Sequence, residues 1–181
     1  MRWAATIGIG CASPFSTKAT PPPKKRAISE FLTAHGYKVA QVTISFGDYA
    51  YNEPYARCLA TNDQQGIDQL KRGYLDGAAL SLQQSVADAE LLYGRDIKHV
   101  MLLHVGSFQT VMLPRLLELL NHREFRLITL PEAASDPAYP MHPDLPSKYG
   151  GTFLEMSLAA RHITPVHNPP LSLAWLDQVC R

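Results

Sequence analysis

The chain contains no long hydrophobic run and no excess of charge of one sign. None of its apolar stretches reaches the length that crosses a bilayer, and 17 basic side chains nearly balance 16 acidic ones. The first absence argues against a membrane span, and the second against a surface for nucleic acid. With 181 residues, 46% of them hydrophobic, the chain is long enough to bury the core of one domain.

Cysteine is also scarce in this sequence. Cys11, Cys58 and Cys180 lie far apart along the chain and match no spacing of zinc ligands. We therefore expect neither a structural metal site nor a disulfide framework, and the cysteines leave the cellular compartment open.

The first 25 residues show no hydrophobic period of 2 or 3.6. One interpretation is a short secretory signal that ends near Cys11 and is diluted by Gly8 and Gly10. A second is an unstructured N-terminus. A third, translation out of frame, depends on the resemblance described below.

From Arg26 onward the pattern alternates between helix and strand. The apolar spacing predicts helices over residues 26–35, 63–72, 76–93, 109–122, 131–135 and 152–161. It predicts strands over residues 38–45, 97–104 and 125–130. Strands that alternate with helices indicate an α/β fold of parallel β/α units with right-handed crossovers.

Two polar side chains stand where the carboxyl ends of such strands carry functional groups, Asp48 and His104. Other interpretations stay open for both. His104 could be a hydrogen-bonded histidine at the edge of the core, and Asp48 could close its loop through a turn. Tyr49 could stack on a sugar or pack against the next helix.

Two stretches resemble a known family. "GYKVAQVTISFGDYAYNEPYARC" and "HVMLLHVGSFQTVMLPRLLELLNHREFRLITLPEAASDPAY" are similar to the C-terminal half of a polysaccharide deacetylase of the NodB-homology, carbohydrate esterase type. The resemblance covers roughly residues 26–150. It implies that residues 26–181 form part of an incomplete, irregular (β/α) barrel. It also implies metal-dependent removal of acetyl groups from N-acetyl or O-acetyl sugars, by C–N bond hydrolysis in the commoner case.

The resemblance assigns roles to four residues. Leu102-Leu103-His104 matches the family's Leu-x-His motif, whose histidine is the acid, and strand alternation puts Leu102 on the same face, where it could line the acetyl pocket. "SFGDY" matches another motif imperfectly, because Ser45 stands where an Asp is usual and Tyr49 where a Trp is usual. Asp48 is then the remaining carboxylate that could pair with His104. The implied catalytic residues are His104 and Asp48, and the implied substrate-binding residues are Leu102 and Tyr49.

Other parts of the family's site are absent. The chain has no Asp-Asp pair and no His-x-x-x-His, the motifs that supply the base and the metal ligands. His99 with His104, and His162 with His167, are each five residues apart, which does not place two ligands on one helical face. The divalent metal that the family uses thus lacks ligands here, and we expect no cofactor and little or no activity from this chain alone.

The expected partners follow from this incomplete site. They are an acetylated polysaccharide or amino sugar, together with a missing N-terminal half or a second copy that covers exposed strand edges. Two alternatives are a non-catalytic carbohydrate-binding remnant and one half of a split deacetylase.

Residues 11–22 carry the third interpretation of the N-terminus. With permitted codons, a shift of two nucleotides turns "CASPFSTKATPP" into Arg-Phe-Pro-Phe-Leu-His-Glu-Gly-Asp-Thr-Pro. That peptide resembles the family motif that orients the base, with its customary Leu-His-Glu-Gly continuation. We therefore interpret the first 25 residues as either unstructured or out of frame, with the family's sequence resuming near Lys24.

Overall fold

The computed structural model describes residues 2–4, 6–7, 22–140, 151–165 and 172–181, and this part of the chain is mostly helical. The α-helices are α1 (Pro22–Ala34), α2 (Asn52–Ala60), α3 (Gln64–Tyr93), α4 (Ser107–His122), α5 (Leu130–Ala134) and α6 (Phe153–Ala160). The 3-10 helices are η1 (Asp48–Tyr51) and η2 (Ala174–Gln178). The strands are β1 (Arg2–Ala4), β2 (Thr6–Ile7), β3 (Val100–Met101) and β4 (Phe125–Leu127).

The strands pair in parallel but remain very short. β1 pairs with β4, β2 pairs with β3, and Ile44 forms an isolated parallel bridge with Met101. The predicted parallel direction is therefore present, whereas the predicted barrel of β/α units is not found in the described ranges, where only two-stranded pairs form. The fold class is corrected to a mixed, mostly helical chain.

The predicted strand over residues 38–45 explains part of this difference. Only Ile44 pairs in it, and the backbone of Val42 instead accepts a hydrogen bond from Phe153 N, at 2.7 Å. The start of α6 thus occupies the backbone edge that a further strand would use.

The N-terminal residues differ from the unstructured interpretation. Residues 2–4 and 6–7 form β1 and β2, and α1 begins at Pro22 rather than at Arg26. Residues 8–21, which hold most of the proposed out-of-frame segment, lie outside the described residues.

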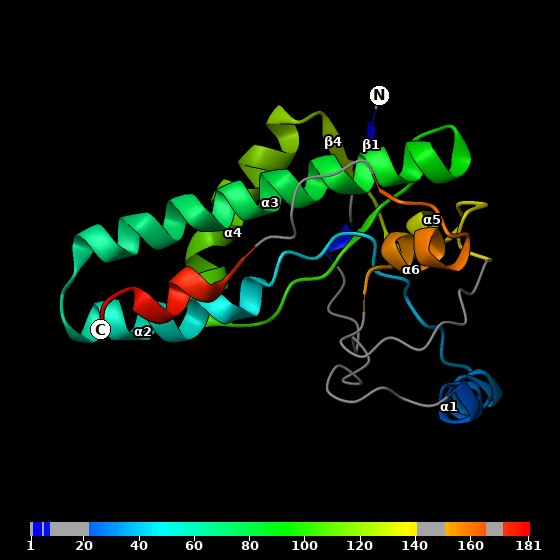
Figure 1. Cartoon of the computed structure of the whole chain (residues 1–181), viewed down its shortest axis with the longest axis horizontal. Helices are drawn as coiled ribbons and strands as arrows, with labels where there is room; N and C mark the ends of the chain where they lie inside the picture. Colours follow the sequence, from blue (N-terminus) through cyan, green and yellow to red (C-terminus); the bar gives the residue numbers. More distant parts are fainter. Residues whose placement is uncertain (1, 5, 8–21, 141–150, 166–171) are drawn as a thin grey trace.

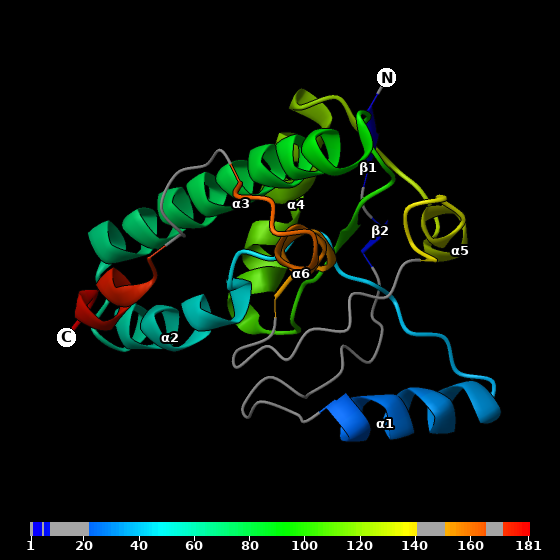
Figure 2. The ribbon, with the colours of Figure 1, turned by 45° about the vertical axis from the view of Figure 1, so that its right-hand side comes forward.

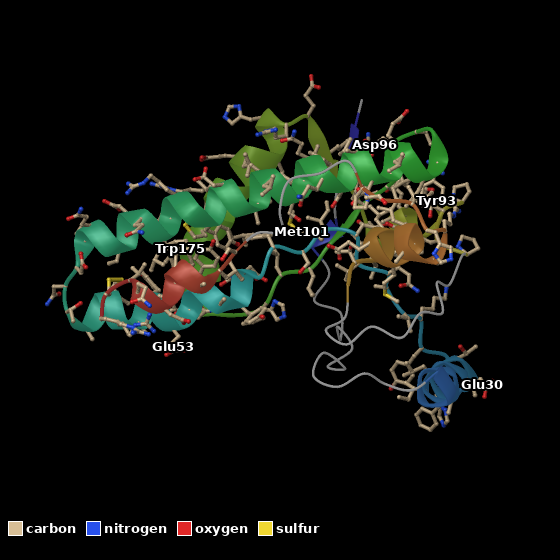
Figure 3. All side chains as sticks on the ribbon, in the orientation of Figure 1. Glu30, Glu53, Tyr93, Asp96, Met101 and Trp175 are labelled. Carbon is tan, nitrogen blue, oxygen red and sulfur yellow. A yellow bond between two sulfur atoms is a disulfide. The ribbon has the colours of Figure 1, made fainter. Side chains whose placement is uncertain are left out.

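Helix α3 extends along the molecule, with α2 and η2 at one end and α5 and α6 at the other (Figure 1). It is one helix of 30 residues where the sequence predicts two. Asp63 caps its start by accepting a hydrogen bond from Gly66 N, at 2.8 Å. A Cβ atom added to Gly73 would overlap the Trp175 ring, which η2 presents to α3 (Figure 3). The glycine between the two predicted helices therefore makes room for a packed ring and does not end a helix.

In the described ranges, the buried side chains form two clusters, and the larger one lies where α2, α3, α4 and β3 meet and includes Met101 (Figure 3). Helix α4 confirms the prediction for residues 109–122 and buries a stripe of side chains, namely Phe108, Met112, Leu116 and Leu120. The short helices predicted over residues 131–135 and 152–161 are confirmed as α5 and α6. Thr152 and Glu155 form a capping box at the start of α6.

A disulfide fastens the C-terminus to the core and corrects the prediction from the cysteine spacing. Cys58 in α2 is bonded to Cys180, at a sequence separation of 122 and with 5.0 Å between their Cα atoms. Arg57 adds hydrogen bonds from Nη2 to Leu176 O at 2.9 Å and to Val179 O at 3.2 Å. Residues this far apart come together only through tertiary packing, so their spacing in the sequence carried no signal.

Helix α1 stands away from the other helices in both ribbon views (Figures 1 and 2). Phe31 is 59% exposed on it, and Tyr37 just after it is 65% exposed. Self-association through such apolar surface stays a prediction. Within the described ranges, no helix combines the length and the hydropathy of a membrane span.

Asp136 forms an ion pair with Arg95 whose contribution to stability can be tested. Its carboxylate is 5% exposed and accepts hydrogen bonds from Arg95 Nη2 at 2.6 Å and from Lys98 N and Ala138 N, both at 3.0 Å. Burial raises the pKa of Asp136, but the hydrogen bonds from Arg95, Ala138 and Lys98 outweigh it and hold this pKa below its ordinary value.

A carboxyl group with a lowered pKa stabilises the folded chain above the pKa of the unfolded state, and this stabilisation is lost as the pH falls through the folded pKa. We expect Asp136→Asn to cost about 2 kcal/mol of unfolding free energy near neutral pH, and much less in acid. Urea unfolding at several pH values measures this difference, and Asp177→Asn, at an exposed carboxylate, is the matched control. A cost for Asp136→Asn that does not change with pH would contradict the ionic role.

Candidate functional site

The structure brings Asp48 and His104 together. Asp48 begins η1, directly after Gly47, and His104 lies three residues beyond β3. The Oδ1 atom of Asp48 is 2.8 Å from His104 Nδ1, and its Oδ2 atom accepts a hydrogen bond from His104 N at 2.7 Å. Both the ring and the backbone of His104 are therefore held by one carboxylate.

Gly47 allows Asp48 to reach this position. Its backbone lies in the left-handed region, with φ 69° and ψ 34°, which side-chain-bearing residues rarely adopt. A Cβ atom there would also overlap Leu173, which precedes η2. The turn that aims Asp48 at the histidine thus requires glycine for two independent reasons.

The environment of the pair fixes the roles of its atoms. Asp48 is fully buried, whereas the His104 side chain is 39% exposed. An ionised carboxylate only accepts hydrogen bonds, so Nδ1 carries the proton that lies between the two residues. No other described residue bonds Nε2 of His104. Nε2 is therefore the nitrogen available to exchange a proton with a bound molecule.

Tyr49 lies beside the histidine, and Leu102 is two residues before it in the chain. The Tyr49 ring meets the His104 ring edge to face, with 5.1 Å between centroids, and Tyr49 is 59% exposed. Leu102 is half-buried and donates from its backbone N to Ile44 O at 3.0 Å. Leu103 packs against the core, and the segment from Leu102 to His104 lies beyond the end of β3.

Two further polar residues belong to this site and were missed by the sequence analysis. Gln109 Nε2 donates to Asp48 Oδ2 at 2.7 Å, and Asn52 Nδ2 donates to Gln109 Oε1 at 3.3 Å. Gln109 is only 8% exposed. It shares the 3/4 spacing of Met112 and Leu116, and a polar residue in that buried stripe was the signal available in the sequence.

Two tyrosines lie beneath the pair. Burial and then Asp76 raise the pKa of Tyr51 to about 12. Burial and then Asp48 raise the pKa of Tyr74, and the hydrogen bond with Gln109 offsets this only in part. Both hydroxyls therefore stay protonated near neutral pH, and neither serves as a base there.

The other predicted histidine positions do not join this site. His99 is fully buried, with its Nδ1 3.2 Å from Thr43 Oγ1 and its Nε2 2.9 Å from Asp96 Oδ1. These contacts use both ring nitrogens to fasten β3 to its surroundings. His167 lies outside the described residues.

The family's metal does not fit the part of the site that the structure describes. Among residues 2–4, 6–7, 22–140, 151–165 and 172–181, no group of three or more His, Cys, Asp or Glu side chains is placed to hold a metal ion. Asp48 also directs both carboxylate oxygens to groups within the chain. We therefore assign no metal-bound step to the described residues of this site.

Comparisons with protein-family models, with curated proteins and with solved structures give no match for this chain.

Proposed function

We propose that this chain supplies the acid side of a metal-dependent polysaccharide deacetylase and that it is inactive alone. The observation that carries the proposal is the buried Asp48 carboxylate on Nδ1 of a histidine whose Nε2 is unoccupied by other described residues. This arrangement suits a general acid, because the carboxylate holds the ring through Nδ1 and leaves Nε2 to donate.

The proposed step is the second half of amide hydrolysis. After water has added to the acetyl carbon, the C–N bond breaks and the departing nitrogen takes a proton from His104 Nε2. The products are a free amine and acetate, and His104 is left neutral, with its remaining proton on Nδ1 in the hydrogen bond to Asp48. The base and the groups that activate the water are not among the described residues.

The neighbouring side chains support a sugar as the substrate. Tyr49 offers an exposed aromatic ring that can stack on an apolar sugar face. Leu102, two residues before His104, is a half-buried apolar side chain of a kind suited to an acetyl methyl group. An acetylated amino sugar or polysaccharide satisfies both contacts.

A binding titration tests this proposal. We expect a tetramer of N-acetylglucosamine to bind saturably and to shift the His104 imidazole signals in NMR spectra. Tyr49→Ala should weaken binding about tenfold, because it removes one aromatic contact. Tyr37→Ala is the matched control, since Tyr37 is as exposed but lies outside the site.

The substrate class and the inactivity are tested separately. A glucosamine tetramer, which has no acetyl groups, should bind more weakly, and an O-acetylated xylose oligomer distinguishes esters from amides. Failure of every acetylated sugar to bind would overturn the proposal. Turnover by purified residues 1–181 with added zinc would overturn the claim that the chain is inactive alone.

A carbohydrate-binding remnant is the second candidate, and the missing metal ligands in the described ranges favour it. For such a remnant, the acetylated and the acetyl-free tetramers should bind equally. If the chain is instead one half of a split deacetylase, activity should return when it is mixed with a polypeptide that carries Asp-Asp and His-x-x-x-His.

A further inference from the structure

We propose that the Cys58–Cys180 disulfide is a site of thiol exchange and that Asp63 makes it select its thiol partner by charge. The partner is a thiol in positively charged surroundings, and Cys180 is the sulfur that it attacks. The site lies where α2, α3 and the C-terminus meet (Figures 1 and 2). The proposal goes beyond the deacetylase reaction and does not depend on it.

The two sulfurs of the disulfide differ in access. Cys58 is fully buried, whereas Cys180 is half-buried next to the end of the chain. Cys180 lines a cavity of about 280 Å³ between the start of α3 and η2, together with Asp63 and Trp175. The course of an exchange reaction depends on which sulfur the attacking thiolate reaches, so Cys180 Sγ is the target.

Asp63 holds a negative charge against this sulfur. Its Oδ1 atom accepts a hydrogen bond from Gly66 N at 2.8 Å, and this cap fixes the carboxylate at the start of α3. Its Oδ2 atom lies 3.2 Å from Cys180 Sγ. A disulfide sulfur carries no proton to donate, so the carboxylate acts on it through charge. The guanidinium of Arg57, on α2, is paired with Glu53 instead, at 3.2 Å.

Gly66 brings the backbone of α3 against the same groups. A Cβ atom there would overlap Cys180 Sγ and would lie 2.9 Å from Asp63 Oδ2 and 3.0 Å from Cys58 Sγ. The carboxylate, both sulfurs and the helix backbone therefore share one small space. Asp63 is held in that space by its own cap, so its charge stays beside the disulfide.

The exchange step places further negative charge at this position. A thiolate attacks Cys180 Sγ, a new S–S bond forms there, and the bond to Cys58 breaks. The electron pair of the broken bond leaves with Cys58 Sγ, which takes a proton from water. While three sulfurs share the charge of the thiolate, the Asp63 carboxylate repels it. A cationic group next to the attacking thiol offsets this repulsion, and an anionic group adds to it.

This preference identifies the chemical class of the partner. Reactive cysteines of proteins lie in electropositive surroundings, which stabilise their thiolates. Asp63 therefore favours exchange with such a protein thiol and disfavours exchange with small anionic thiols.

The test uses the full chain and two small thiols of opposite charge, cysteamine as the cation and mercaptoethanesulfonate as the anion. Each rate is divided by the rate of the same thiol with an uncharged model disulfide. We expect the wild type to favour cysteamine about fivefold at low salt, and Asp63→Asn to remove most of this preference. Asparagine caps a helix as well as aspartate does. Asp177→Asn, at an exposed carboxylate, should keep the wild-type preference.

Alkylation of the quenched reaction and mass spectrometry of its peptides identify the attacked sulfur. We expect cysteamine on Cys180 and the alkyl group on Cys58. Asp63→Ser keeps a capping oxygen but adds no amide, and it should behave like Asp63→Asn. Because the preference is a ratio of two thiols on one variant, a loss of stability that speeds both reactions equally does not change it.

An unchanged preference in both folded Asp63 variants would overturn the proposal. A change restricted to Asp63→Asn would overturn it as well, because the new amide rather than the lost charge would then be responsible. Attachment of cysteamine mainly to Cys58 would contradict the assignment of the attacked sulfur.

Discussion

Asp48→Asn is expected to lower the free energy of unfolding by about 3 kcal/mol. The wild-type carboxylate is fully buried and accepts three hydrogen bonds, from His104 N, His104 Nδ1 and Gln109 Nε2. An asparagine has one acceptor oxygen, so its NH₂ group must face one of these donors. With its oxygen at the Oδ2 position, the amide keeps the two donors there, and its NH₂ group turns His104 into the Nε2–H tautomer. With the opposite orientation, His104 N and Gln109 Nε2 lose their acceptor.

Urea unfolding measures the stability of this variant, and the imidazole ¹⁵N signals report on His104. Asp177→Asn changes an exposed carboxylate to the same amide and should cost almost nothing. An Asp48→Asn chain with wild-type stability and an unchanged His104 spectrum would show that the pairing is not formed in solution.

Removal of the disulfide is expected to cost about 4 kcal/mol. Cys58 and Cys180 close a loop with a sequence separation of 122, and a bond across so long a loop restricts the unfolded chain strongly. The double variant Cys58→Ser, Cys180→Ser should therefore unfold at a much lower urea concentration. The C-terminal residues should loosen first, because this bond and the Arg57 hydrogen bonds fasten the end of the chain to α2.

A dithiol reductant gives the matched experiment. It should lower the stability of the wild type to that of the double serine variant and leave the variant unaffected. If a thiol assay shows both cysteines reduced while wild-type stability is unchanged, the disulfide does not contribute in the way described.

The helices with local signals were predictable from the sequence, whereas two of the predicted strands form only in part, as β3 and β4. Thr152 with Glu155 and the apolar stripe of α4 are contained within single segments, so the sequence was sufficient to find those helices. The strand predicted at residues 38–45 needed a neighbouring strand on each side. On one side, Phe153 N instead donates a hydrogen bond to Val42 O. Gly73 looked like an interruption because its partner, Trp175, is remote in the sequence.

The candidate site was also predictable from the sequence only in part. His104 and Asp48 each stood at a predicted strand end, so their approach could be anticipated, although their roles remain proposals. Asn52 and Gln109 are 57 residues apart and touch only because α2 and α4 pack together. The orientation of two side-chain amides depends on that packing, and a local pattern does not contain it.

The nucleotide sequence of the gene, from about four hundred bases upstream through the codon for Arg26, tests the half-enzyme proposal most directly. We expect the codons of residues 11–22 to read Arg-Phe-Pro-Phe-Leu-His-Glu-Gly in the shifted frame, and the upstream bases to encode Asp-Asp and His-x-x-x-His in that frame. Incompatible codons, together with no such motifs upstream, would contradict the proposal. His104 would then be an acid without a base, and sugar binding would be the function left to test.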